Sequence, residues 1–285
     1  MWQAIIKERI FKYNFFLLII FCISFFTTFV FAQSGDNKPS EKWVVDTETR
    51  IHSVNKITTT NKFFYNDKHI LNKIITSMSR ANFNSTSTVE YYFDENGRQT
   101  KLIHKSVTGK VQTESVTLTS YDSNNHINKL NNTTRSNDQL TTMTIEYVNN
   151  DKGKPIKTVT STNNGPPSTI LTEYDQCGNI SKYQMSNNIG TETKYEYMKD
   201  KDCLILGQVM ISRGQVVSKE EFEYTSNDKV KRSIKTDISP IPNQPPRKTV
   251  TDNIYDENDN LVKSIMSDGT GKIIMTTTKT YIKLK

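Results

Sequence analysis

The chain has 285 residues, of which only 34% are hydrophobic, so its composition argues against a thick, many-layered core. Its formal net charge is +7 at pH 7, carried by scattered Lys residues. This pattern favours a solvated strand surface whose Lys residues protect the sheet edges from pairing with other chains, rather than a face that binds polyanions. No nucleic-acid partner is expected. The abundant Thr, Tyr, Phe, Ile and Val suit half-buried strands, and Asn and Asp suit the turns between them.

The N-terminus has the pattern of a targeting signal. A basic start is followed by an uncharged apolar run from Phe15 to Ala32. We predict cleavage after Ala32 and export to the periplasm, the cell surface or the medium. At about 18 residues the run just reaches the length of a membrane span, so the alternative is that it stays uncleaved as an anchor. In that case this segment is the only expected contact with the membrane. The predicted divisions are a signal peptide (1–32), a flexible lead (33–42) and a repeat-built β-sheet domain (43–285).

One sequence unit recurs through the rest of the chain. In its clearest copy, Tyr174-Asp175 is followed by a turn containing Gly178, an aliphatic residue at Ile180 and a base at Lys182. The anchor aromatics of the copies are Tyr65, Phe93, Tyr121, Tyr147, Tyr174, Tyr197, Tyr224 and Tyr255, with Tyr281 continuing the series. Their spacing of about 27 residues is typical of repeat architectures.

Two of these units deviate from the pattern. After Tyr147 and Tyr197 the aliphatic residue comes late, at Ile156 and Leu204. The spacing therefore predicts longer turns at these two places.

Each unit has a second turn signal near its middle, such as Thr108-Gly109 or Ser212-Arg213-Gly214. Two turns leave two strands of about eight or nine residues per unit. Apolar and polar residues alternate in these strands: Tyr195 and Tyr197 share one face, and Lys194 the other. No stretch after residue 33 keeps a helical apolar spacing, so we predict an all-β fold with the aromatics of all units on one face.

Sixteen or seventeen antiparallel strands in a meander are too many to stay flat. The aromatic face also needs cover, and no helix is available to supply it. We predict one long curled sheet or incomplete barrel, with an apolar inner face and a solvated outer face. A 16-stranded outer-membrane barrel ranks last, because runs such as 113–119 and 248–253 are too polar to face lipid.

The motif Tyr-Asp-x-x-Gly followed by an aliphatic residue and a base resembles the YD repeats of Rhs-like and teneurin-like proteins. The best matches are Tyr174-Asp175 with Gly178, Phe93-Asp94 with Gly97, and Tyr255-Asp256. In that family the repeats form long β-sheets that spiral into a hollow shell, often around a toxin domain. This chain has far fewer units, so the resemblance implies a sheet scaffold rather than an activity.

No catalytic, cofactor-binding or metal-binding constellation stands out in the sequence. The four histidines (His52, His69, His104 and His126) fall at different offsets from their anchors, so the repeat does not stack them. The acidic turns at 94–96 and 256–260 lack the ligand spacing of a calcium loop and indicate solvated turns. The anchors themselves are expected to serve packing, with each Asp or Asn accepting backbone hydrogen bonds within its turn.

Cys177 and Cys203 lie in the anchor turns of adjacent units. Equivalent positions one unit apart would be about 9.6 Å apart, too far for a disulfide. The longer turn expected after Tyr197 could bring them closer, and an exported compartment permits the bond. A disulfide and two unpaired thiols both remain open.

These features predict an exported, non-enzymatic repeat protein that acts as a binding or structural surface for a glycan, an envelope polymer or another surface protein. The first alternative is a carrier that holds a lipid or other hydrophobic guest inside an incomplete barrel. The second is a hydrolase with its site on the longer turns near Tyr147, Tyr197 or 240–246.

Overall fold

The structure, a computed structural model, describes residues 43–80, 83–137, 139–163, 165–185, 191–239, 241 and 243–283. The predicted signal peptide and flexible lead lie outside these residues. No helix long and apolar enough to cross a bilayer is found in the part of the chain described. The strands are β1 (Trp43–His52), β2 (Ile57–Tyr65), β3 (Leu71–Arg80), β4 (Phe83–Phe93), β5 (Gln99–Thr108), β6 (Val111–Tyr121), β7 (Ile127–Ser136), β8 (Gln139–Asn149), β9 (Pro155–Thr162), β10 (Gly165–Tyr174), β11 (Ile180–Met185), β12 (Thr191–Lys199), β13 (Ile205–Ser212), β14 (Gln215–Tyr224), β15 (Val230–Asp237), β16 (Arg247–Tyr255), β17 (Leu261–Asp268) and β18 (Ile273–Lys283).

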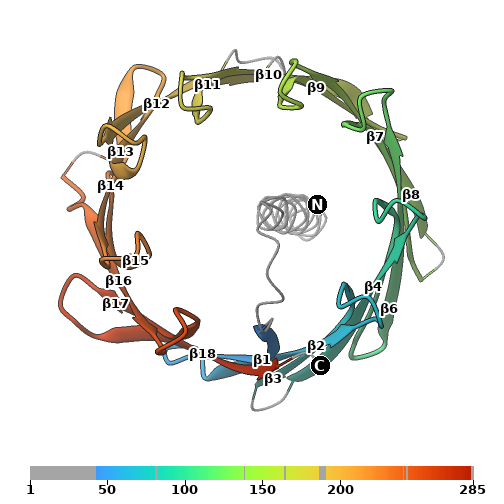
Figure 1. The fold of residues 1–285 in the computed structure, drawn as a ribbon, viewed down its shortest axis with the longest axis horizontal. Coiled ribbons are helices and arrows are strands. Elements are labelled where there is room, and N and C mark those ends of the chain that lie inside the picture. The colour runs from blue at the N-terminus through green and yellow to red at the C-terminus, as the bar shows by residue number, and fades with distance from the viewer. Residues whose placement is uncertain are drawn as a thin grey trace, which may run out of the picture. The chain divides into compact units, whose positions relative to one another are not determined.

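The strands form one closed ring (Figure 1). Each pairs antiparallel with its neighbours in sequence, and β1 also pairs with β18, from Trp43 opposite Lys283 to His52 opposite Met275. The predicted all-β antiparallel meander is confirmed. The predicted incomplete barrel is wrong, because β1 is a full strand and covers the edge that β18 would otherwise expose. Closure removes both unpaired edges of the sheet.

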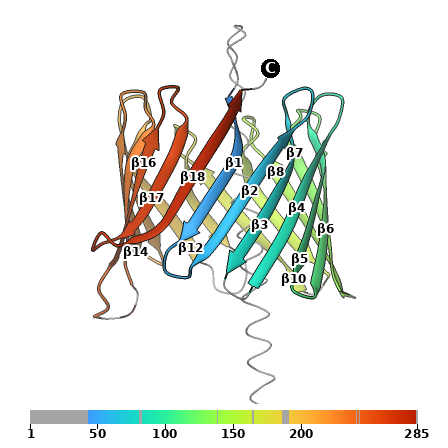
Figure 2. The same ribbon diagram turned by 90° about the horizontal axis from the view of Figure 1, so that it is seen from below.

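The ring is too wide to be filled by its own side chains. Eighteen strands about 4.8 Å apart and tilted by about 40° enclose a cylinder roughly 35 Å across, backbone to backbone. In the described residues only four hydrophobic side chains are buried, Val44, Ile74, Leu130 and Val250, and no large side chain is buried completely. The barrel wall is therefore one sheet thick, which explains the low hydrophobic content. Figure 2 shows the strands tilted along this wall.

Strand register gives the wall two different faces. On β12 and β13, Tyr195 pairs with Met210 and belongs to one face, whereas Lys194 pairs with Ile211 on the other. The face that carries the anchors is the less exposed one in strand after strand. Side chains converge on the concave side of a closed sheet and cover one another, so we assign the anchor face to the inside of the ring, called the lumen here. The register confirms that the anchor aromatics share one face, whereas Phe64 and Tyr92, one residue before their anchors, lie on the other.

The turns that follow the even-numbered strands share one construction. Asp94 shows it: its backbone N–H donates to the Arg98 carbonyl at 2.9 Å, and its carboxylate accepts the N–H groups of Asn96 and Arg98 at 3.0 and 2.9 Å. Equivalent turns begin at Asn66, Asp94, Asp122, Asn150, Asp175, Asp200, Thr225 and Asp256. We call these eight the anchor turns, and the end of the barrel where they lie the anchor rim.

The longer turns expected after Tyr147 and Tyr197 do not exist. Those anchor turns begin at Asn150 and Asp200 and have the common length. Each aromatic instead lies two residues before its strand end, where Asn149 and Lys199 take the usual anchor position. A shift of two residues keeps a side chain on the same face of a strand, so both tyrosines still face the lumen.

The anchor turns are expected to weaken in acid. The Arg98 backbone N–H and, after an opposing desolvation, the Arg98 side chain lower the pKa of Asp94. The ionised form therefore favours folding above the ordinary carboxyl pKa of about 4, and this contribution is lost as pH falls through the lower folded pKa. The variant Asp94→Asn keeps the turn, since Asn150 makes the same bonds naturally. Urea unfolding should show that the wild type is more stable than the variant at pH 7 and that the two are equally stable at pH 2.5. The same difference in free energy of unfolding at both pH values would contradict this role of the Asp94 carboxylate.

Candidate functional site

The anchor tyrosines hold the backbone of the preceding strand. The Tyr121 hydroxyl donates to the Gln99 carbonyl at 2.9 Å, and the Tyr174 hydroxyl to the Pro155 carbonyl at 3.0 Å. The same bond is made by Tyr65, Tyr197, Tyr224, Tyr255 and Tyr281. In each case the acceptor belongs to the strand that precedes the strand of the tyrosine.

The unit built on Tyr147 achieves the same contact differently. Its strand-end residue, Asn149, donates its side-chain amide to the Ile127 carbonyl at 2.8 Å. Tyr147 itself points into the lumen, where burial raises the pKa of its hydroxyl. Phe93 occupies the anchor position of β4 and has no hydroxyl. All eight predicted anchors therefore face the lumen. Those whose hydroxyls donate to a backbone carbonyl stabilise the barrel wall.

Neighbouring anchor turns are tied to one another along the rim. The Arg98 guanidinium donates to the Asn125 side chain at 2.6 Å, and the Lys154 ammonium donates to the Gly178 carbonyl. Further along, Lys199 pairs with Asp175, and Asn227 donates to Asp259 at 2.7 Å. These ties join four pairs of neighbouring anchor turns and so link different units at the anchor rim.

A disulfide joins Cys177 to Cys203, with 5.9 Å between the two Cα atoms. The expected 9.6 Å applied to equivalent positions, but Cys177 is the third residue of its anchor turn and Cys203 the fourth. The offset of one residue brings them within reach. A longer second turn, the reason given from the sequence, plays no part.

Glycine is required in the anchor turn that follows β8. Gly153 has φ +73°, and a Cβ added there would lie 2.5 Å from the His126 ring. Gly97 has φ +77° but open space around it. We expect Gly97→Ala to cost about 1 kcal/mol through backbone strain alone, and Gly153→Ala about 1–2 kcal/mol more, because the His126 ring must move. Thermal unfolding of both variants tests this, and equal losses would show that His126 gives way freely.

The described residues contain no group of three or more His, Cys, Asp or Glu that could hold a metal ion. The four histidines lie on different strands and turns, and His126 is taken up by packing over Gly153. In the acidic turns, Asp94 and Asp256 spend a carboxylate oxygen on backbone N–H groups of their own turn. These carboxylates act as turn-forming groups.

A second feature of the lumen is an aromatic cluster on β11–β14. Tyr183 and Tyr195 have ring centroids 6.1 Å apart, Tyr195 and Tyr197 6.3 Å, and Phe222 and Tyr224 6.4 Å. We call these five residues, together with Gln208 and Glu220, the lumenal patch.

Two polar side chains connect the aromatic groups of the lumenal patch. Gln208 on β13 is opposite Tyr197 on one side and Glu220 on the other. Its amide donates to the Glu220 carboxylate at 2.8 Å. The arrangement offers flat apolar faces beside hydrogen-bonding groups, as ligand sites commonly do. The sequence alternation identified Tyr195 and Tyr197 as one face, but it gave no sign that Gln208 and Glu220 bridge two aromatic groups across strands.

A buried ionic network lies on the lumen side where β1 meets β18. The Glu48 side chain is 7% exposed and pairs with Arg50 at 2.7 Å and Lys279 at 3.3 Å. The Asn61 amide donates to the same carboxylate at 3.1 Å, and the Thr76 hydroxyl donates to Asn61 at 2.8 Å. We call this set the seam network, because it spans the strands that close the ring.

The outer face carries charged residues within the strands. Cross-strand ion pairs join Lys73 to Glu90 at 3.1 Å and Lys129 to Glu146 at 3.0 Å. Similar pairs are Lys105–Glu114, Lys182–Glu192 and Arg232–Asp252. These side chains are part-exposed and are interspersed with aliphatic residues such as Leu118 and Val148, which are about half exposed.

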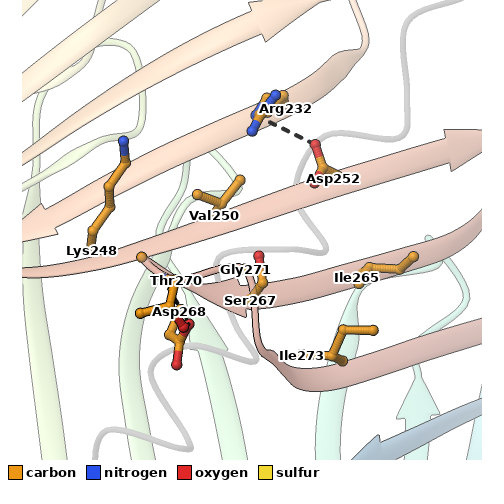
Figure 3. Close-up of a pocket in the computed structure, with 11 residues that line it drawn as sticks. Arg232, Lys248, Val250, Asp252, Ile265, Ser267, Asp268, Thr270, Gly271 and Ile273 are labelled. Carbon is orange, nitrogen blue, oxygen red and sulfur yellow. Dashed lines mark hydrogen bonds and ion pairs between the residues drawn. The ribbon is translucent and has the colours of Figure 1, made fainter.

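The outer face also has a cleft of about 520 Å³ near the turn between β17 and β18 (Figure 3). Val250 and Ile265 line it, and Arg232 lies 3.5 Å from Asp252 at one end. Since opposite charges already pair within it, the cleft offers no strong preference for a charged ligand.

No family model matches the sequence, and no curated protein matches it. Among solved structures, a porin-like protein from Bacteroides uniformis ATCC 8492 is similar, with 10% sequence identity and a TM-score of 0.45. The match covers 87% of this chain and 99% of that chain. A likeness at this level does not decide the function.

Proposed function

We propose that the protein is an exported, non-enzymatic barrel that stands in water and binds a polar polymer, such as a glycan or another envelope polymer, in its lumen. The observation that carries the proposal is the contrast between the two faces. Outside lie cross-strand ion pairs such as Lys129–Glu146. Inside, polar side chains such as Asn132 and Thr162 alternate with apolar ones such as Met143, so the interior is more polar than the expected apolar one.

The outer face is unsuited to lipid. A Lys or Arg at the middle of a bilayer costs a barrel about 2–4 kcal/mol, and the cost falls to about 0–1 kcal/mol near the interfaces. Between the charged positions the outer face carries polar residues such as Asn131 and Thr133, which also match lipid poorly. Export rests on the apolar N-terminal run, and any membrane contact would be made by that segment alone.

The lumen supports a polar guest better than a lipid. Its buried polar side chains include Thr117, Thr119, Thr193, Ser218 and Thr277. Part-exposed polar side chains on the same face, such as Asn132 and Thr134, would lose their contact with water beside an acyl chain. Two of the three places named for a hydrolase site, the turns after Tyr147 and Tyr197, have the common length. The third, at 240–246, lies partly outside the described residues.

The experiment uses the exported full-length protein in detergent-free buffer. We expect it to remain in solution when mixed with liposomes and to be retarded in native gels containing soluble neutral polysaccharides or peptidoglycan fragments. Flotation with liposomes through the barrel domain, or unchanged mobility in every polymer gel, would overturn the proposal.

A further inference from the structure

We propose that the lumenal patch is a subsite for a neutral oligosaccharide; this rests on the proposed function and specifies the ligand class. The sugar rings would stack on the tyrosines, and their hydroxyls would bond to Gln208 and Glu220. The argument depends on the chemistry of the patch, on its charge, and on the fact that the wall does not need all of it.

The chemistry fits a pyranose. One face of a sugar ring presents C–H groups, which pack on the electron-rich face of an aromatic ring, while its edge carries hydroxyls that donate and accept. The Tyr183, Tyr195 and Tyr197 rings provide a row of faces about 6 Å apart. Gln208 presents a carbonyl and an amide beside that row, and Glu220 presents acceptors.

The charge of this sector favours a neutral ligand. Between the strand ends, Glu220 is the one charged inward side chain that the described residues of β11–β14 contribute. Its neighbours on the same face include Thr193, Ser212 and Ser218. Two bases also lie beside the patch: Lys235 on β15 is opposite Glu220, and the Lys199 ammonium lies 4.9 Å from the centre of the Tyr197 ring and pairs with Asp175. The inward charges around the patch therefore have both signs and give no strong preference for an acidic or a cationic polymer.

Part of the patch goes beyond what the wall requires. Tyr197 and Tyr224 spend their hydroxyls on the carbonyls of Ile180 and Ile205, as anchors do. Tyr195 has a different environment: burial and the neighbouring Tyr183 raise its pKa, and its ring stacks on Tyr197. A ring that is half-buried in the lumen and does not hold the wall is available to a ligand.

The test measures binding of maltohexaose, cellohexaose and chitohexaose to the full-length protein by calorimetry. We expect binding of at least one, a loss of about tenfold or more in Tyr195→Ala and in Gln208→Ala, and near wild-type affinity in Tyr195→Phe, which keeps the ring. Tyr92→Ala is the matched control, because Tyr92 lies on the outer face with Lys101 over its ring. The melting temperature of each variant shows that the barrel is folded.

Two results would overturn the inference in different ways. If the protein binds a polymer but Tyr195→Ala and Gln208→Ala bind as wild type does, the lumen binds elsewhere and the patch is not the subsite. If none of the three hexasaccharides binds while another polymer class does, the ligand class is wrong and the proposed function stands. If no polymer of any class binds, both proposals fail.

Discussion

Replacing Glu48 with alanine is expected to lower the free energy of unfolding by about 2 kcal/mol, because the buried Asn61 amide and the part-buried Lys279 ammonium lose their acceptor, while the half-exposed Arg50 is solvated by water. Arg50, Lys279 and Asn61 all direct a donor at its carboxylate. The network lies where β1 and β18 close the ring, so the pairing of these two strands should be weakened most. Urea unfolding followed by far-UV circular dichroism measures it.

The matched control is Glu146→Ala on the outer face. Glu146 also pairs with a lysine, at 3.0 Å, but its side chain is 57% exposed. An exposed pair contributes about 1 kcal/mol or less. Equal losses in the Glu48 and Glu146 variants would show that the seam network has no special role.

Removing the disulfide with Cys177→Ser and Cys203→Ser together is expected to cost about 3 kcal/mol, since the bond closes a loop of moderate length in the unfolded chain. The two cysteines are 26 residues apart. They flank β11, which at six residues is the shortest strand of the described wall. The disulfide therefore lies where strand pairing contributes the fewest hydrogen bonds to stability.

Reduction of the wild-type protein supplies the control. Dithiothreitol should lower the stability of wild type to that of the double variant and leave the variant unchanged. Two free thiols in the purified, folded protein, or a double variant as stable as wild type, would contradict the expected role of the bond.

What the sequence predicted correctly is local. Alternation over two or three residues is enough to place Tyr195 and Lys194 on opposite faces, because side chains alternate strictly along a strand. The turn after Tyr174 was equally readable, because Asp175 and Gly178 have the residue types that such a turn needs. The resemblance to YD repeats stays a prediction, since no family model matches the chain.

What the sequence could not show depends on distant pairing or on chemical substitution. Closure needs β1 to meet β18, whose residues are more than 200 positions apart, and no local signal marks such a partner. The unit at Tyr147 was misjudged because an asparagine amide, that of Asn149, replaces a tyrosine hydroxyl. The link between Gln208 and Glu220 appears only once the register of β13 and β14 is known.

The account depends most on the closure of the ring, and hydrogen exchange measured by mass spectrometry on the folded protein tests it directly. In a closed barrel the backbone amides of β1 and β18 are bonded on both sides, so their peptides should exchange as slowly as those of β6 and β7. Rapid exchange of about half the amides in β1 and β18, with β6 and β7 protected, is the behaviour of an open sheet with two edges and would contradict the closed barrel.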